Sequence, residues 1–257
     1  MEQEQLIRKV TEIGNGAHIF APKEWLNEEV LVIRIEKKEL KEEILELVYP
    51  YLNKIIAVFI YGSHARGEAS ETSDIDVLII SKEKFKIETK RNFGFLILTE
   101  ESLESAIKIN PILMYSIFKE AKPMINEDYL NKYKNKKISM KDFSSFIKST
   151  ENTSIKSSEE VLELDRKTGN IASNSVIYSI ILRLRGIFII ECLLKNKEYS
   201  NSSFKIWINN HVKLDYEKVY GVYRAVRDNR VGKDSIPLFI GEELIKFWGL
   251  CITGTKL

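Results

Sequence analysis

The feature that most constrains this chain is a strand–turn–strand segment near residue 60. An apolar run over residues 55–61 leads into Gly62-Ser63, ten residues separate Ser63 from Asp74, and Asp74-Ile75-Asp76 opens a second apolar run. Short apolar runs rich in β-branched residues and bounded by a turn predict two strands. Asp74 and Asp76 stand two positions apart, so on a strand both carboxylates project from one face.

These residue types suit the binding of phosphate and a cation. Gly62 lacks a Cβ, so its backbone can approach a ligand closely or take a positive φ where a strand turns into a helix. Ser63 adds a hydroxyl and a backbone N–H that can cradle phosphate. Two neighbouring carboxylates repel each other unless a cation lies between them, and Mg²⁺ accepts one or two carboxylates together with water and phosphate oxygens. The alternative is an ordinary turn followed by a solvated strand start, but the combination and spacing favour a site for nucleotide phosphates.

The segment resembles the signature of the DNA-polymerase-β-like nucleotidyltransferase superfamily, in which Gly-Ser is followed at this distance by Asp-x-Asp. The longer pattern, Gly-Ser-x-Ala-Arg-Gly and then Ser-Asp-Ile-Asp, looks like the minimal and antibiotic-type members. The resemblance covers about residues 39–130. It implies transfer of NMP from an NTP to a hydroxyl of a protein, an RNA or a small molecule, with Mg²⁺ or Mn²⁺ as cofactor. The residues it implicates are Asp74 and Asp76 as catalytic metal ligands, and Gly62, Ser63 and Arg66 for the nucleotide.

The resemblance departs from the superfamily pattern at one position. A later strand there usually supplies a third carboxylate, whereas this chain has Gly94 or Phe95 at the corresponding place in 92–98. Glu100 and Glu101 follow, but they read as first-turn residues of a helix with Thr99 as N-cap. An acid from the C-terminal half could take over, for example Glu159, Glu160 or Glu163. Without one, the alternative is a dimeric regulatory protein that binds nucleotide but turns it over weakly or not at all. Arg66 could also pair with a surface acid instead of a triphosphate.

The N-terminal 37 residues form a separate predicted module. Strands are expected over 6–10, 17–21 and 30–35, with a turn at Gly14-Asn15-Gly16 and a one-turn helix after Pro22. About 35 residues cannot bury a core of their own. The pattern resembles AbrB-type swapped-hairpin modules, which implies a homodimer and possible DNA binding. The alternative is a hairpin packed on the neighbouring domain.

The remainder is predicted to be mostly helical. We expect a helix over 36–49, a hairpin loop over 82–91, a helix over 100–109, a helix over 112–120 capped by Asn110-Pro111, a strand over 122–125 and a linker over 132–141. Further helices are predicted at about 140–149, 156–168, 171–196, 202–212, 214–229 and 239–251. This half resembles HEPN-like or kanamycin-nucleotidyltransferase-like helical domains. Arg224 and Arg227 are not followed by the His of HEPN nucleases, so no ribonuclease activity is expected. The face with Tyr216, Tyr220, Tyr223 and both arginines favours packing over nucleotide stacking.

The predicted fold is therefore multidomain α+β: a β module over 1–37, a nucleotidyltransferase domain with a mixed sheet over 38–130 and a helical bundle over 138–257. The 39 basic and 37 acidic residues nearly cancel, so no overall field indicates nucleic acid. Arg183, Arg185 and Glu191 interrupt the apolar run 176–194, which predicts a buried helix and no membrane span. Cys192 and Cys251 lack metal-ligand spacing, and with no signal-peptide pattern at the start they favour a cytoplasmic protein.

Overall fold

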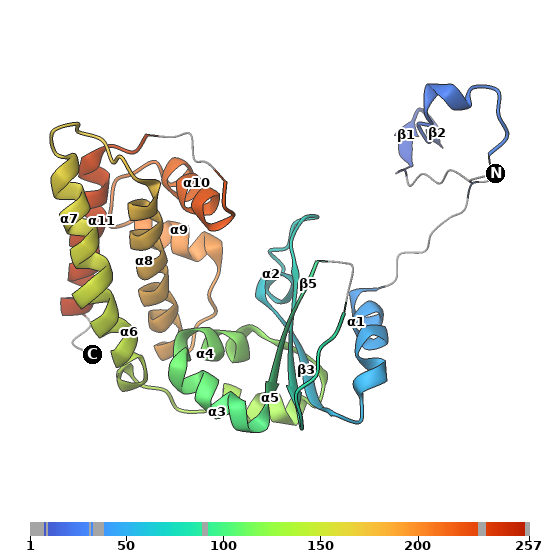
Figure 1. Ribbon diagram of the computed structural model, residues 1–257, viewed down its shortest axis with the longest axis horizontal. Coiled ribbons are helices and arrows are strands. Elements are labelled where there is room, and N and C mark those ends of the chain that lie inside the picture. Colours follow the sequence, from blue (N-terminus) through green and yellow to red (C-terminus); the bar gives the residue numbers. More distant parts are fainter. Residues whose placement is uncertain are drawn as a thin grey trace. The chain divides into compact units, whose positions relative to one another are not determined.

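The computed structural model of this chain forms two compact units, residues 1–40 and residues 41–257 (Figure 1). It describes residue 8, residues 10–30, residue 32 and residues 39–88, 92–230 and 235–254. Most of the predicted strands over 6–10 and 30–35 lie outside the described residues. The described Val10, Val30 and Val32 are not in strands.

The first unit contains an antiparallel hairpin of β1 (Thr11–Ile13) and β2 (Gly16–His18), in which Ile13 pairs with Gly16. Gly14, with a φ of 55°, and Asn15 form the two-residue turn, as the sequence predicted. The predicted strand positions were wrong: because the turn begins at Gly14, pairing starts at Ile13 and covers 11–13, and the second strand ends at His18. A 3-10 helix over Lys23–Trp25 follows Pro22 as expected.

The second unit is built on a mixed four-stranded sheet in the order β5-β4-β3-β6. Its antiparallel centre pairs β3 (Ile55–Tyr61) with β4 (Ile75–Ser81), so that Tyr61 lies opposite Asp76. β6 (Lys122–Ile125) pairs antiparallel with β3, and β5 (Phe93–Thr99) pairs parallel with β4. The mixed sheet and the strands at 55–61 and 122–125 were predicted. The register places the end of β3 beside the start of β4.

Alternating apolar residues bury both faces of this sheet. Ala57 and Phe59 of β3 join the large core cluster, whereas Val58 and Ile60, equally buried, point to the other face. Figure 1 shows helix α1 (Leu40–Val48) on one side and helices α3 (Glu100–Ile109) and α4 (Pro111–Glu120) on the other. Both later helices begin at the side chains expected to cap them: Thr99 accepts from the N–H of Ser102, and Asn110 from that of Leu113.

Two predicted connections differ in the structure. Residues 82–91 do not form a hairpin loop, because β4 and β5 run parallel; a polar connection fits either strand direction, so composition could not decide between them. The predicted linker over 132–141 is shorter, since helix α5 (Glu127–Lys134) takes its first residues. Lysines carry good helix propensity, and the lysine-rich composition concealed this helix end.

The C-terminal half is helical, as predicted, with boundaries within three residues of those expected. Residues 140–155 form three successive short turns: a 3-10 turn (Met140–Phe143), helix α6 (Ser144–Ser149) and a π-helical stretch (Thr150–Ile155). The longer helices are α7 (Lys156–Asp165), α8 (Asn174–Leu194), α9 (Asn201–Asn209), α10 (Tyr216–Arg227) and α11 (Leu238–Gly254). No helix in the described part of the chain is long and apolar enough to cross a membrane.

Helix α8 is the centre of this half, and it packs against α4, α10 and α11. At Gly186 a Cβ would lie 2.4 Å from Cζ of Phe146, so the absence of a side chain there permits this close approach. Cys192 is buried and Cys251 half-buried, and neither is in a disulfide. Burial raises the pKa of Cys192 to about 11 and that of Cys251 to about 12, so both behave as small uncharged groups.

Candidate active site

A cleft of about 1220 Å³ lies in the second unit between the sheet and the helical half. It is large enough for a nucleotide together with a second substrate, since pockets for drug-sized ligands measure about 300–1,000 Å³. One wall contains all five residues that the sequence singled out. They are Gly62, Ser63, Arg66, Asp74 and Asp76.

The turn after β3 is built around Gly62. This residue opens the short helix α2 (Gly62–Arg66) with a φ of 72°, the positive value expected for it. A Cβ on Gly62 would lie 2.2 Å from Oδ2 of Asp76, so the backbone of the turn rests directly on that carboxylate. Asp74 precedes β4 and Asp76 is its second residue. Strand pairing therefore brings Gly62 and the Asp-x-Asp segment together.

The pKa of the Asp76 carboxylate is shifted from its ordinary value. Burial raises its pKa above the ordinary range, and the negative charges of Asp74 and Glu120 act in the same direction. Burial also raises the pKa of Tyr61, the last residue of β3, to about 12, so its hydroxyl is protonated at neutral pH. An accumulation of buried negative charge of this kind fits a divalent cation. In the described part of the chain no group of three or more His, Cys, Asp or Glu side chains is placed to hold a metal, so the fit rests on two carboxylates plus water and phosphate.

The sheet shows which residue stands where a third carboxylate was expected. Asp76 pairs with Gly94 in the parallel register, and a Cβ at Gly94 would lie 3.2 Å from Oδ1 of Asp76. Gly94, and not Phe95, is therefore the β5 residue beside Asp76. Glu159, Glu160 and Glu163 do not line the cleft.

Glu120 is a carboxylate that sequence reasoning missed. As the last residue of α4, it accepts a hydrogen bond from the N–H of Gly62 at 2.8 Å, and its other oxygen pairs with Arg66 at 2.7 Å. Arg66 also donates from Nε to Glu68 at 2.9 Å. The guanidinium is thus held by two mostly buried acids that line the cleft with it, and its contact with a nucleotide stays a prediction.

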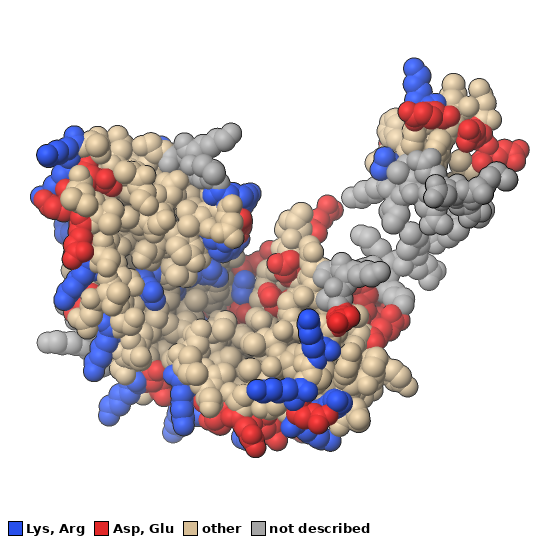
Figure 2. All heavy atoms as spheres, viewed as in Figure 1, with Lys and Arg blue, Asp and Glu red and all other residues tan. Residues whose placement is uncertain are grey.

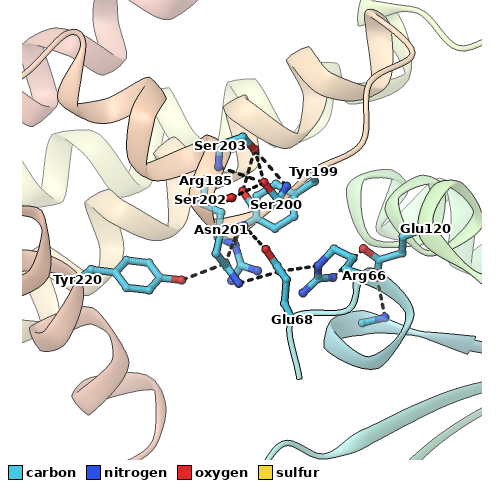
Figure 3. Close-up of polar contacts among 11 residues, drawn as sticks. Arg66, Glu68, Glu120, Arg185, Tyr199, Ser200, Asn201, Ser202, Ser203 and Tyr220 are labelled. Atoms are coloured by element: carbon cyan, nitrogen blue, oxygen red, sulfur yellow. Dashed lines mark hydrogen bonds and ion pairs between the residues drawn. The ribbon is translucent and has the colours of Figure 1, made fainter. Parts of the chain in front are cut away.

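Glu68 continues this polar network into the helical half (Figure 3). Its carboxylate accepts from the backbone N–H of Asn201 at 2.9 Å and from Nδ2 of Asn201 at 3.0 Å. Asn201 in turn accepts from Tyr199 at 2.8 Å and from Tyr220 at 3.3 Å. This Glu120–Asn201 network links the turn at Gly62 to the start of α9. The bonds made by Glu120 to Arg66 and by Glu68 to Asn201 join residues 54 and 133 positions apart, separations that leave no local sequence signal.

The fold and the site define a class of protein. The sequence model of the family described as "Nucleotidyltransferase domain" matches residues 37–147. Relatives from Methanocaldococcus jannaschii include "Putative protein adenylyltransferase MJ0141", 37% identical over 76 residues, which are 30% of this chain and 73% of that protein. The chain belongs to the nucleotidyltransferase domain family, and the class of enzyme is a nucleotidyltransferase.

Other relatives match shorter stretches of themselves. "Putative protein adenylyltransferase MJ0604" is 40% identical over 50 residues, 20% of this chain and 50% of its own length. "Putative protein adenylyltransferase MJ0126" is 52% identical over 48 residues, 19% of this chain and 40% of its own length. The chain therefore spans half or less of these two relatives.

Two solved structures show a weak overall similarity to this chain. Spectinomycin adenyltransferase AAD(9) from Enterococcus faecialis gives a TM-score of 0.43 at 13% identity, covering 82% of this chain and 97% of that one. A nucleotidyltransferase-like protein from Exiguobacterium sibiricum gives 0.38 at 11% identity, covering 84% and 75%. Likeness at this level says nothing about substrates.

Proposed function

We propose that this protein is a Mg²⁺-dependent adenylyltransferase that transfers AMP from ATP to a hydroxyl acceptor. The observation that carries the proposal is the direct packing of the Gly62 turn on Asp76, with Asp74 beside it, in the wall of a cleft of about 1220 Å³. ATP is favoured among NTPs because the matched relatives are named adenylyltransferases. Mn²⁺ would fit the same oxygen ligands.

Each residue has a role in this proposal. Asp74 and Asp76 hold the metal, which when bound offsets the charge of the triphosphate and of departing pyrophosphate. Gly62 and Ser63 receive the phosphates. The acceptor oxygen bonds to the α-phosphorus, the bond from that phosphorus to the bridging oxygen of pyrophosphate breaks, and the hydroxyl proton passes to water. Arg66 positions the turn through Glu120.

The test is transfer from α-labelled ATP in the presence of Mg²⁺, with and without a cell lysate as the source of acceptor. Asp74→Ala and Asp76→Ala should abolish labelling while the protein stays folded. Asp128→Ala, which removes an exposed acid of α5 outside the cleft, is the matched control and should label like wild type. Retained labelling by Asp76→Ala would overturn the mechanism.

A second candidate follows from Gly94, which leaves no side chain beside Asp76. In it, the protein binds Mg²⁺ and nucleotide without transfer and acts as a dimeric regulator through its N-terminal unit. Equilibrium binding of ATP with no label transferred to any lysate component would favour it.

We further propose that the N-terminal unit forms a homodimer and contacts DNA or a protein partner. Its described apolar side chains are well exposed, as expected for a unit that lacks a core: Ile13 at 60%, Phe20 at 71%, Leu26 at 72% and Val32 at 66%. Sedimentation of the full chain should give a dimer, and Phe20→Glu with Leu26→Glu should give a monomer. A wild-type monomer at micromolar concentration would contradict this.

A further inference from the structure

The wall of the cleft opposite the aspartates is strongly basic. Five arginines line it, two from α8, two from α10 and one just after α10, together with one carboxylate, Asp228. The arginines are Arg183, Arg185, Arg224, Arg227 and Arg230. Five positive charges less one negative charge leave this wall at +4. In Figure 2 blue side chains gather on the helical side of the hollow, and red ones on the side of the sheet.

Neither arginine of α8 has a carboxylate partner among the described residues. Arg185 donates to the hydroxyls of Tyr199 at 2.8 Å and Tyr223 at 3.2 Å, which are neutral groups. Arg183 lies 5.5 Å from the ring centroid of Phe146, and its buried Nε has no hydrogen-bond partner. Removing a cation from water without an opposing charge is costly. Both side chains line the cleft, so an anionic ligand would supply the missing charge.

Helix α10 adds cations at regular spacing. Tyr220, Arg224 and Arg227 stand four and three residues apart and line the cleft together, so they form one stripe with about 5–6 Å between neighbours. Asp228 pairs with both Arg227 and Arg230 and can neutralise only one of them. Arg224 is exposed and has no acidic partner among the described residues. A row of cations along a helix suits a chain of phosphates better than a single carboxylate.

The stripe also contains an aromatic ring, that of Tyr220. The half-buried ring of Tyr220 stacks on Tyr216 at 5.0 Å and on Tyr223 at 5.2 Å, and Tyr220 lines the cleft. The other two rings are buried at 7% and 1% exposure, so the predicted packing role holds for them. Of these three tyrosines, Tyr220 lines the cleft, and the Arg224 guanidinium lies over its ring at 5.6 Å from the centroid. An aromatic ring beside a row of arginines is the combination that binds single-stranded nucleic acid.

We infer that the acceptor is the end of a single-stranded polynucleotide, whose phosphates lie along the α8–α10 arginines while its terminal hydroxyl reaches the Asp74–Asp76 wall. This rests on the proposed adenylyl transfer. A cationic acceptor such as an aminoglycoside would be repelled by the same wall. The family match ends at residue 147, so the arginines are outside it and the acceptor need not be that of the named relatives.

The test uses the full chain and fluorescein-labelled twelve-nucleotide RNA and DNA strands, with binding followed by anisotropy at several salt concentrations. Four phosphate contacts predict a slope of log affinity against log salt of about −3. Arg224→Gln should weaken binding roughly tenfold and make the slope shallower by about 0.7. Arg166→Gln, which removes an exposed arginine outside the cleft, is the matched control and should bind as wild type. Whichever strand is also extended by labelled AMP identifies the sugar that the site accepts.

Binding of a fluorescent ATP analogue with Mg²⁺ separates this inference from the proposed function. Arg224→Gln should leave ATP affinity within about twofold of wild type. If ATP affinity falls as far as strand affinity, the arginines serve the triphosphate and the inference is overturned. It is also overturned if neither strand binds at low salt, or if Arg224→Gln and Arg166→Gln behave alike, or if an acidic peptide is adenylylated and neither strand is. A wild-type protein that binds strands but never ATP would instead refute the proposed function.

Discussion

The packing of the Gly62 turn on Asp76 can be tested by comparing the two glycines that open and cap helix α2. Gly62, the first residue of α2, and Gly67, its C-cap, have nearly equal φ values of 72° and 73°. A Cβ at Gly67 would meet nothing within 4 Å, whereas one at Gly62 would lie 2.2 Å from Oδ2 of Asp76. Gly67→Ala therefore introduces backbone strain alone, and Gly62→Ala introduces the same strain together with a collision.

The strain common to both variants is the cost of a left-handed conformation, about 1–2 kcal/mol for an L-residue. For a unit of this size, 1 kcal/mol lowers the melting temperature by about 2–4 °C, so Gly67→Ala should melt about 2–8 °C below wild type. Gly62→Ala should lose at least as much stability. In addition, the Asp76 carboxylate has to move by an ångström or more, and a misplacement of that size can cost about 100-fold in rate.

Thermal melting and AMP transfer, measured on the same preparations of both variants, separate the backbone strain from the displacement of Asp76. Gly67→Ala should transfer AMP at close to the wild-type rate at a temperature where it is folded, and Gly62→Ala should lose about 100-fold under the same conditions. If Gly62→Ala retained transfer within a few-fold of Gly67→Ala, the carboxylate would not need the position it has beside the turn, and the proposed geometry would be refuted.

Two further predictions concern charge in the same wall. Burial, and then Asp74 and Glu120, raise the pKa of Asp76 above its ordinary 3.8, so the native state binds this proton more tightly than the unfolded chain does. The stability that protonated Asp76 contributes is therefore present below about pH 4 and is lost as the pH rises through the raised pKa. Melting temperatures measured against pH without divalent metal should show this loss in wild type and not in Asp76→Asn. Identical pH profiles for the two proteins would contradict the prediction. Glu120→Gln should cost about 2 kcal/mol in urea unfolding, because it breaks a pair whose side chains are only 10% and 15% exposed while Arg66 keeps its second acid. Glu163→Gln, which breaks the exposed ion pair with Arg166, should lower the free energy of unfolding by less than about 1 kcal/mol. Equal losses in the two variants would show that burial of the Glu120–Arg66 pair is unimportant.

The parts of the fold that were predictable are those fixed by neighbouring residues. The strand at 55–61, the turn with positive φ at Gly62 and the caps at Thr99 and Asn110 depend on a few consecutive side chains, and each was found where expected. The helices of the C-terminal half followed from apolar periodicity. Strand direction carries no such signal, which is why the parallel pairing of β4 with β5 was missed.

The candidate site divides in the same way. The Gly62 turn and Asp76 could be recognised from the sequence because they lie within 15 consecutive residues. Glu120 and Asn201 reach the site only through tertiary contacts. The basic wall did leave a signal. Arg183 and Arg185 interrupt an apolar helix, which served to exclude a membrane span, although two costly charges on a buried helix also indicate a polar cavity beside it.

In the proposed function, the absence of a side chain at Gly94 limits how the site would hold a metal. Both oxygens of Glu120 are engaged, one by the N–H of Gly62 and the other by Arg66, so this acid adds negative charge near Asp76 without offering a free ligand. Asp74 and Asp76 then supply the only carboxylates we assign to the metal, and Mg²⁺ bound by two carboxylates completes its shell with water and substrate phosphates. Much of the metal's binding energy must therefore come from the nucleotide, and the nucleotide in turn requires the metal to approach two acids. We expect metal and ATP to bind cooperatively, because each removes the charge that excludes the other.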